Sequence, residues 1–313
     1  MKNLSQVHVG VDVSKEKLDI FIYPKGVSIT VENSKKGINK LIDTLSKYDV
    51  LQVVFEATGG YEKQLHDMLN KKSYNCWNVD PRRIKGFIIS TGCKAKTDKI
   101  DAKKIAEFSS KYSKDYDSTI RTAQEESLLS LVDRRFDLIK FLTSEKTRLK
   151  HPVHQNCITS IKKIIKMLEK EIKQIEKQVE KLIAENETIS ARSKLLESIP
   201  GIGKTTAATL IASVPEIGTI SNNKISALVG LCPYEFESGS FKGKKFIRGG
   251  RIAPRNALYM CALTTIKYHL PLKNFYDRLI AANKPFKVAI VAVMRKLIVM
   301  ANAILRNGEP CRL

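Results

Sequence analysis

The stretch VHVGVDV at residues 7–13, followed by LDIFIY at residues 18–23, decides the fold of the N-terminal part of this chain. In the first run valine alternates with His8, Gly10 and Asp12, a period of two that predicts a strand. The intervening Ser14-Lys15-Glu16 predicts a turn into a partner strand, and residues 27–31 would complete a meander.

Beyond the meander, helical and strand patterns alternate. Ile38, Leu41, Ile42 and Leu45 recur at helical spacing, residues 51–55 form a short apolar run, and a second helical pattern precedes the run at residues 76–79. This order predicts an α/β domain over residues 1–120.

Two carboxylates stand where these predicted strands can bring them together. Asp12 lies in the first strand, and Glu56 follows the strand at residues 51–55. If the two strands are neighbours, both side chains project toward the same edge of the sheet. In the helix expected after Thr97, Asp98 and Asp101 continue the stripe of apolar residues that should face the sheet.

Each acid has an ordinary explanation when taken alone. Asp12 could start a turn with Ser14, Glu56 could cap the turn at residues 58–60, and Asp98 could be a first-turn acid favoured by the helix dipole. Four converging carboxylates would nevertheless repel one another unless divalent cations were bound. Oxygen ligands that leave room for phosphate suit Mg²⁺, with Mn²⁺ as a substitute. We therefore predict a magnesium site at Asp12, Glu56, Asp98 and Asp101.

The overall charge points to a polyanionic partner. The chain has 54 Lys and Arg against 32 Asp and Glu, a formal net charge of +22, which suits salt-dependent binding to phosphate backbones. Basic residues also flank the acid pair and would neutralise DNA phosphates there, although a solvated helix face explains each of them singly. They include Lys94, Lys96 and Lys99.

Nothing in the sequence favours a membrane or an oxidising compartment. No charged-then-apolar leader opens the chain, and the apolar stretch at residues 288–305 contains Arg295 and Lys296. Six cysteines without a C-x-x-C pair indicate reduced, structural thiols. We expect a cytoplasmic protein.

Several motifs resemble a known family. VGVDVSKEKLD, VVFEATGGYE and KAKTDKIDAKKIA resemble the N-terminal half of the DEDD transposases of the insertion-sequence one-ten family, relatives of the Piv and MooV invertases. SGSFKGKKFIRGGRIAPRNALYMCAL and the stretch at residues 275–308 are similar to their C-terminal half. The resemblance implies a RuvC-like, RNase H-type domain carrying the four acids, a coiled-coil segment and a smaller transposase domain. It also implies attack on DNA by a serine, and a structured non-coding guide RNA.

Residues 121–190 have a heptad pattern that predicts a helical coiled-coil segment. One seam position holds Ile158, Ile165, Ile172 and Val179, and the other holds Ile161, Leu168, Ile175 and Leu182. We favour a homodimer or higher homo-oligomer, because strand exchange needs more than one active site. An intramolecular hairpin would use the same surface, through Leu128, Val132, Ile139 and Leu142.

A mainly helical C-terminal domain is expected over residues 191–313, and it opens with a glycine-rich turn. SIPGIGKT at residues 198–205 imitates a P-loop, but Ser198 stands where its first glycine belongs and no strand precedes it. The segment instead resembles a helix-hairpin-helix, with Gly201, Gly203 and Lys204 at a phosphate. A turn that only packs two helices is the alternative.

A basic, glycine-rich stretch follows at residues 239–256 and contains no acid. We predict nucleic-acid contacts from its six basic residues, Lys242, Lys244, Lys245, Arg248, Arg251 and Arg255. Ser238 precedes it, and neighbouring positive charge can stabilise a developing alkoxide and a pentavalent phosphorus. A Ser-Gly pair is usually a turn, but the family resemblance identifies Ser238 as the candidate nucleophile, with Ser240 as the fallback.

These features together predict a DNA transposase or site-specific recombinase that acts on donor and target DNA with a guide RNA. It would cut and rejoin strands through Mg²⁺-assisted serine attack and a covalent phosphoserine intermediate. Two other classes stay open from the residues alone. A Holliday-junction-type nuclease would use the same acids to activate water, and a non-catalytic nucleic-acid-binding scaffold would use only charge and coiled coil.

Overall fold

The computed structural model of the chain forms two compact units, Met1–Ile120 and Arg121–Leu313. It describes residues 6–92, 98–113, 122–151, 153–235, 237–238, 241–242 and 245–311, without side chains at 98–100, 237–238 and 241–242. Four predicted site residues lie outside the described residues, namely Lys94, Lys96, Ser240 and Lys244. Four more are described by backbone alone, namely Asp98, Lys99, Ser238 and Lys242.

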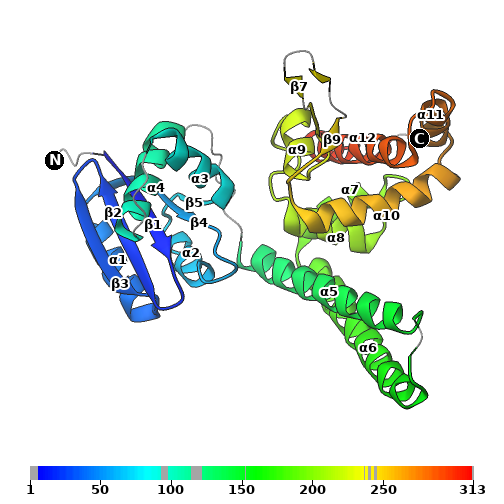
Figure 1. Ribbon diagram of the computed structural model, residues 1–313, viewed down its shortest axis with the longest axis horizontal. Helices are drawn as coiled ribbons and strands as arrows, with labels where there is room; N and C mark the ends of the chain where they lie inside the picture. Colours follow the sequence, from blue (N-terminus) through cyan, green and yellow to red (C-terminus); the bar gives the residue numbers. More distant parts are fainter. Residues whose placement is uncertain are drawn as a thin grey trace. The chain divides into compact units, whose positions relative to one another are not determined.

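The first unit is built on a five-stranded mixed sheet (Figure 1). The order is β3-β2-β1-β4-β5, with β1 Gln6–Val13, β2 Lys17–Tyr23, β3 Val27–Glu32, β4 Asp49–Glu56 and β5 Cys76–Val79. β1, β2 and β3 pair antiparallel, whereas β1 with β4 and β4 with β5 pair parallel. The expected neighbourhood of the first and fourth strands is confirmed.

Helices cover both faces of this sheet. α1 (Lys35–Leu45) and α2 (Lys63–Asn70) pack on the face that carries the β1 valines, while α3 (Pro81–Ser90) and α4 (Asp98–Tyr112) pack on the other. α1 begins at Ser34, whose hydroxyl accepts a hydrogen bond from the Gly37 N–H. Burial raises the pKa of the Cys76 thiol to about 12, as expected for an unreactive structural cysteine.

α4 lies directly on β1 at Gly10. A Cβ atom added to Gly10 would be 2.2 Å from the Ala102 carbonyl oxygen and 2.3 Å from the Ala106 nitrogen. Glycine is therefore required for helix and strand backbones to touch here. Ile105 and Phe108 are buried against the sheet, as their spacing predicts.

The second unit begins with a hairpin of two long helices, α5 (Ala123–Arg148) and α6 (Gln155–Glu185). α5 starts with a capping box between Thr122 and Glu125. Leu138 packs against Leu168 and Ile172, so the heptad seam of α6 is buried within the chain. The structure thus contains the intramolecular hairpin, and a dimer through this seam is not compatible with it.

The remaining helices enclose one large apolar core. They are α7 (Glu187–Glu197), α8 (Lys204–Ser213), α9 (Asn222–Leu228), α10 (Ile252–Tyr268), α11 (Leu270–Ala281) and α12 (Phe286–Asn307). Between α9 and α10 lie four two-residue strands, β6 (Pro233–Tyr234), β7 (Glu237–Ser238), β8 (Phe241–Lys242) and β9 (Phe246–Ile247). The first unit is a mixed sheet covered by helices, and the second unit is mainly helical. The expected fold class of α/β plus α is thereby confirmed.

α12 is long and apolar enough to cross a membrane by length and composition alone. Half of its most apolar window is buried inside the unit, where Val293, Leu297 and Ala301 are fully inaccessible. This burial is typical of the central helix of a packed domain.

Replacement of Gly10 by alanine should destabilise the first unit by about 1 to 3 kcal/mol or more, because the methyl group would push α4 away from β1. Trp77, the sole tryptophan, is buried against α4, so its fluorescence during urea unfolding reports this change. Gly86→Ala is the control, since it meets nothing within 4 Å and should stabilise α3 by about 0.5 to 1 kcal/mol. Equal midpoints for Gly10→Ala and wild type would contradict the close contact.

Candidate functional site

Asp12 and Glu56 lie at the same edge of the sheet. The parallel register pairs Val9 with Val53 and Val11 with Phe55, so one further step brings Asp12 beside Glu56. Residues in register on neighbouring strands share a face and lie about 4.8 Å apart. That face is the one covered by α4, because Gly10, two residues before Asp12, contacts the helix backbone. Both acids are partly exposed and can therefore meet solvent or a ligand.

Along the direction of β1, the first turn of α4 lies at the position of Asp12. The His8 ring is 2.9 Å from the Ser109 hydroxyl, and Gly10 lies against Ala102 and Ala106, so α4 runs opposite to β1. The two strand residues from Gly10 to Asp12 span about 6.6 Å, which corresponds to about four helix residues. The backbones of Asp98 and Asp101, in the first turn of α4, therefore lie near the edge that carries Asp12. Asp101 is partly buried.

A fifth acid, Asp19 on β2, lies directly beside Asp12 of β1. The two residues are Cα partners in the antiparallel pair of β1 and β2, and Asp19 is 5% exposed. Its carboxylate accepts a hydrogen bond from the Thr30 hydroxyl at 2.5 Å and lies 3.0 Å from the Lys17 ammonium group. Sequence reasoning missed it, although its place in the alternating run at residues 18–23 was the available signal.

The turn after β4 has its own carboxylate. Glu62 is 7% exposed, and its Oε2 accepts hydrogen bonds from the Thr58 N–H, the Thr58 hydroxyl and the Gly60 N–H. Burial alone would raise the pKa of Glu62, but these bonds, with one from its own N–H, outweigh burial and lower that pKa. Because Glu62 caps this turn, the capping explanation for Glu56 loses its basis.

The donors at the sheet edge fit a hard divalent cation. Asp12, Glu56 and Asp101 offer carboxylate oxygens from three different elements, and oxygen-only sets suit Mg²⁺ or Mn²⁺. Partial exposure leaves room for the waters that Mg²⁺ usually retains. Adjacent like charges on neighbouring strands repel one another, and a bound cation would offset this repulsion.

In the second unit, the turn between α7 and α8 is fixed to α10. Gly201 has φ +89°, and a Cβ there would be 2.1 Å from the Thr265 hydroxyl, which donates to the Pro200 carbonyl at 3.0 Å. Gly203, at the N-cap of α8, has nothing within 4 Å of its added Cβ. Gly201, Gly203 and Lys204 are all exposed, but only Gly201 lies against α10, so Gly203 and Lys204 are the more open part of the turn.

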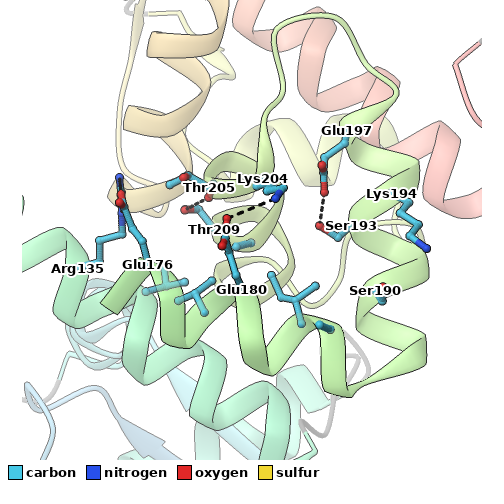
Figure 2. Close-up of a pocket in the computed structure, with 15 residues that line it drawn as sticks. Arg135, Glu176, Glu180, Ser190, Ser193, Lys194, Glu197, Lys204, Thr205 and Thr209 are labelled. Atoms are coloured by element: carbon cyan, nitrogen blue, oxygen red, sulfur yellow. Dashed lines mark hydrogen bonds and ion pairs between the residues drawn. The ribbon is translucent and has the colours of Figure 1, made fainter. Parts of the chain in front are cut away.

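Beside Lys204 lies a cavity of about 330 Å³ between α5, α6, α7 and α8 (Figure 2). The Lys204 ammonium group is 3.4 Å from Glu180, and Glu197 accepts a hydrogen bond from the Ser193 hydroxyl at 2.7 Å. Glu176 lines the same cavity and pairs with Arg135 at 2.7 Å. Three glutamates and three cations line this cavity, and two of the cations, Arg135 and Lys204, are paired with Glu176 and Glu180.

The basic, glycine-rich stretch is anchored to the rest of the second unit by Arg251. β6 pairs with β9, β7 pairs with β8, and Ser238 is opposite Phe241 in the short ladder. Arg251 donates to both carboxylate oxygens of Glu216 at 2.6 and 2.7 Å and to the Ser213 carbonyl at 2.9 Å.

The other described cations of this stretch differ in their surroundings. Arg255 donates to the Gly249 carbonyl at 2.6 Å, and Lys245 forms an ion pair with Glu235. Arg248 is exposed. Arg251 and Arg255 therefore hold the loop, and whether they also contact nucleic acid stays a prediction.

Arg251→Lys should destabilise the second unit by about 1 to 2 kcal/mol, because lysine cannot reproduce the two-point bond to Glu216. Urea unfolding followed by the helical circular dichroism signal, which comes mostly from this unit, measures the loss. The exposed Arg248→Lys is the matched control and should change stability by less than about 0.5 kcal/mol. If both variants unfold alike, the ion pair is not what holds the loop.

Comparisons with known proteins agree on one family. Residues 9–158 match a model described as transposase, of the DEDD type of IS110, and residues 193–277 match a model described as transposase of the IS116/IS110/IS902 family. Pilin gene-inverting proteins of Moraxella bovis and Moraxella lacunata are each 26% identical to the chain over 98% of both lengths.

An insertion element IS110 protein of 43.6 kDa from Streptomyces coelicolor is 31% identical over 119 residues, 37% of this chain and 29% of that protein. The matched segments include the edge with Asp12 and Glu56 as well as the turn before α8. This chain belongs to the IS110 family of transposases and DNA recombinases.

Proposed function

We propose that the chain cuts and rejoins DNA strands at a magnesium site formed by Asp12, Glu56, Asp98 and Asp101, with Ser238 as nucleophile. The observation that supports this most is the in-register placement of Asp12 and Glu56 beside the first turn of α4. The strand order β3-β2-β1-β4-β5, three antiparallel strands and then two parallel ones, supports a RuvC-like, RNase H-type domain.

The four acids act by binding and orientation. Asp12 and Glu56 extend from rigid strands, and Asp98 and Asp101 extend from a helix fixed on those strands, so little reorganisation is needed when substrate arrives. When bound, Mg²⁺ would orient the scissile phosphate and stabilise charge on the leaving oxygen. Lys17 pairs with the buried Asp19 beside this edge of the sheet. The positive charge of Lys17 can offset the negative charge of the carboxylates where DNA approaches them.

The proposed chemistry at Ser238 is a transesterification. A bond forms between the serine oxygen and phosphorus as the DNA phosphorus–oxygen bond breaks, while the serine loses its proton and the departing DNA oxygen gains one. The number of phosphate ester bonds is unchanged, so a hydroxyl of another strand can reverse the step without external energy. The surrounding cations would stabilise the phosphorane, and the Arg251–Glu216 pair would keep the loop in place.

Three exposed features support a nucleic-acid surface on the second unit. Lys204 and the open Gly203 mark the start of α8, where unpaired N–H groups favour a phosphate as in a helix-hairpin-helix. Tyr268 is 83% exposed, and its ring is available to stack on an unpaired base. The net charge of +22 supplies the general attraction.

A structured guide RNA and self-association complete the proposal. Both follow from the family resemblance, and an unpaired RNA segment would suit exposed Tyr268. Because the α6 seam is buried against α5, a homodimer needs another surface, and the outer side of the hairpin exposes Phe141 and Met167 by 56% and 57%.

Ser238→Ala should abolish covalent protein–DNA product, because no other group at that position can form the ester. The measurement incubates full-length protein with Mg²⁺, guide RNA and labelled donor DNA, and counts label retained with denatured protein. Ser240→Ala is the matched control and should retain the adduct. Adduct at wild-type level in Ser238→Ala would remove the serine from the mechanism, and adduct lost only in Ser240→Ala would move the role there.

Asp98→Asn should reduce strand cleavage by at least about a hundredfold while leaving DNA affinity within about threefold, because one ligand charge is lost but the basic surface is not. Chelation of divalent ions should have the same effect on the wild type. Asp43→Asn, an exposed acid of α1, is the control. Unchanged recombination in Asp98→Asn would leave only a binding role for this domain.

A further inference from the structure

A buried polar cluster joins α4 to the same two strands that carry the paired acids. His8 on β1 and Gln52 on β4 are Cα partners, and both reach the hydroxyl of Ser109 on α4, each at 2.9 Å. Ser109 is 0% exposed and Gln52 is 1% exposed. Buried polar groups of this kind lose a partner if any member shifts, so the cluster strongly specifies how α4 sits on the sheet.

The cluster and the proposed metal site are formed by the same three elements, β1, β4 and α4, and lie at opposite ends of them. His8 precedes Asp12 by four residues, Gln52 precedes Glu56 by four, and Ser109 follows Asp101 by eight. Four strand residues span about 13 Å and eight helix residues span about 12 Å, so the two sets lie a similar distance apart on strand and helix. Gly10 lies between them and holds the backbones in contact.

The pairing of β4 with β1 is adjusted at this point. The register shifts by one residue between Val7 and His8, from Val7 opposite Val50 to His8 opposite Gln52. Because a one-residue shift exchanges the two faces of a strand, it brings Gln52 and Glu56 to the α4 side. The Ser109 hydroxyl donates to the Gln52 amide oxygen and also lies within hydrogen-bond distance of the His8 Nδ1. Burial lowers the pKa of His8, which favours the neutral ring at pH 7.

We infer that His8, Gln52 and Ser109 are positioning residues that fix the first turn of α4 over β1 and β4, and thereby set the spacing of the metal-binding carboxylates. This inference rests on the proposed magnesium site. The three residues touch neither metal nor DNA. They act by preventing α4 from sliding along the sheet, a movement that Gly10 alone, having no side chain, does not resist.

The test is Mn²⁺ binding to the full-length chain, followed by the electron paramagnetic resonance signal of the free ion. Only the Mn²⁺ binding that disappears in the Asp12→Asn variant is assigned to the proposed site. Ser109→Ala should weaken Mn²⁺ binding at that site by about tenfold, as loss of outer-shell support does elsewhere. His8→Ala, which leaves the Ser109–Gln52 bond intact, should cause a smaller loss and supplies the answer if Ser109→Ala does not fold.

Two controls separate positioning from general stability. Ser110→Ala removes a neighbouring hydroxyl that bonds only the Glu107 carbonyl within α4, and Ile38→Val loosens the core on the other face of the sheet. Both should bind Mn²⁺ like the wild type at a temperature where every variant is folded. Wild-type binding in Ser109→Ala and His8→Ala would overturn the positioning role. Absence of an Asp12-dependent site in the wild type would instead overturn the proposed function itself.

Discussion

The contact between the backbone of β1 at Gly10 and the backbone of α4 at Ala102 and Ala106 is the constraint on which the rest of the first unit depends. It brings a helix closer to a sheet than side chains would normally allow. The first turn of that helix thereby reaches the edge where β1 and β4 end. Without this approach, acids on the helix and acids on the strands would be separated by a layer of side chains, and no ion could bind both.

The distribution of charge follows from the same requirement. A chain with net charge +22 suits a polyanionic partner, yet it brings Asp12 and Glu56 together at one edge of a sheet. Asp19 adds one more, and its charge is offset locally by Lys17 and by the Thr30 hydroxyl. Elsewhere, Glu216 has a structural use as the partner of Arg251.

Local patterns in the sequence were sufficient for part of this structure. Alternation around Asp12 and the apolar run before Glu56 predicted two strands, because burial on one face fixes the period of a strand, and the structure shows that these strands are neighbours. The heptads of α6 did not decide between a dimer and a hairpin, because either partner buries the same seam. The roles of Gly10 and Gln52 were out of reach, since they depend on which helix covers the sheet. The pairing of Arg251 with Glu216 was also out of reach, because the two residues are 35 positions apart in the sequence.

The proposed function requires that β1, β4 and α4 bring their carboxylates together around divalent metal. Diffraction at the manganese absorption edge, from crystals of the full-length chain grown with Mn²⁺, tests it most directly. We expect an anomalous peak about 2.0 to 2.3 Å from carboxylate oxygens of Asp12 and Glu56, with an aspartate of the first turn of α4 as a further ligand. A peak elsewhere, or these carboxylates bonded only to lysines with no ion among them, would contradict it.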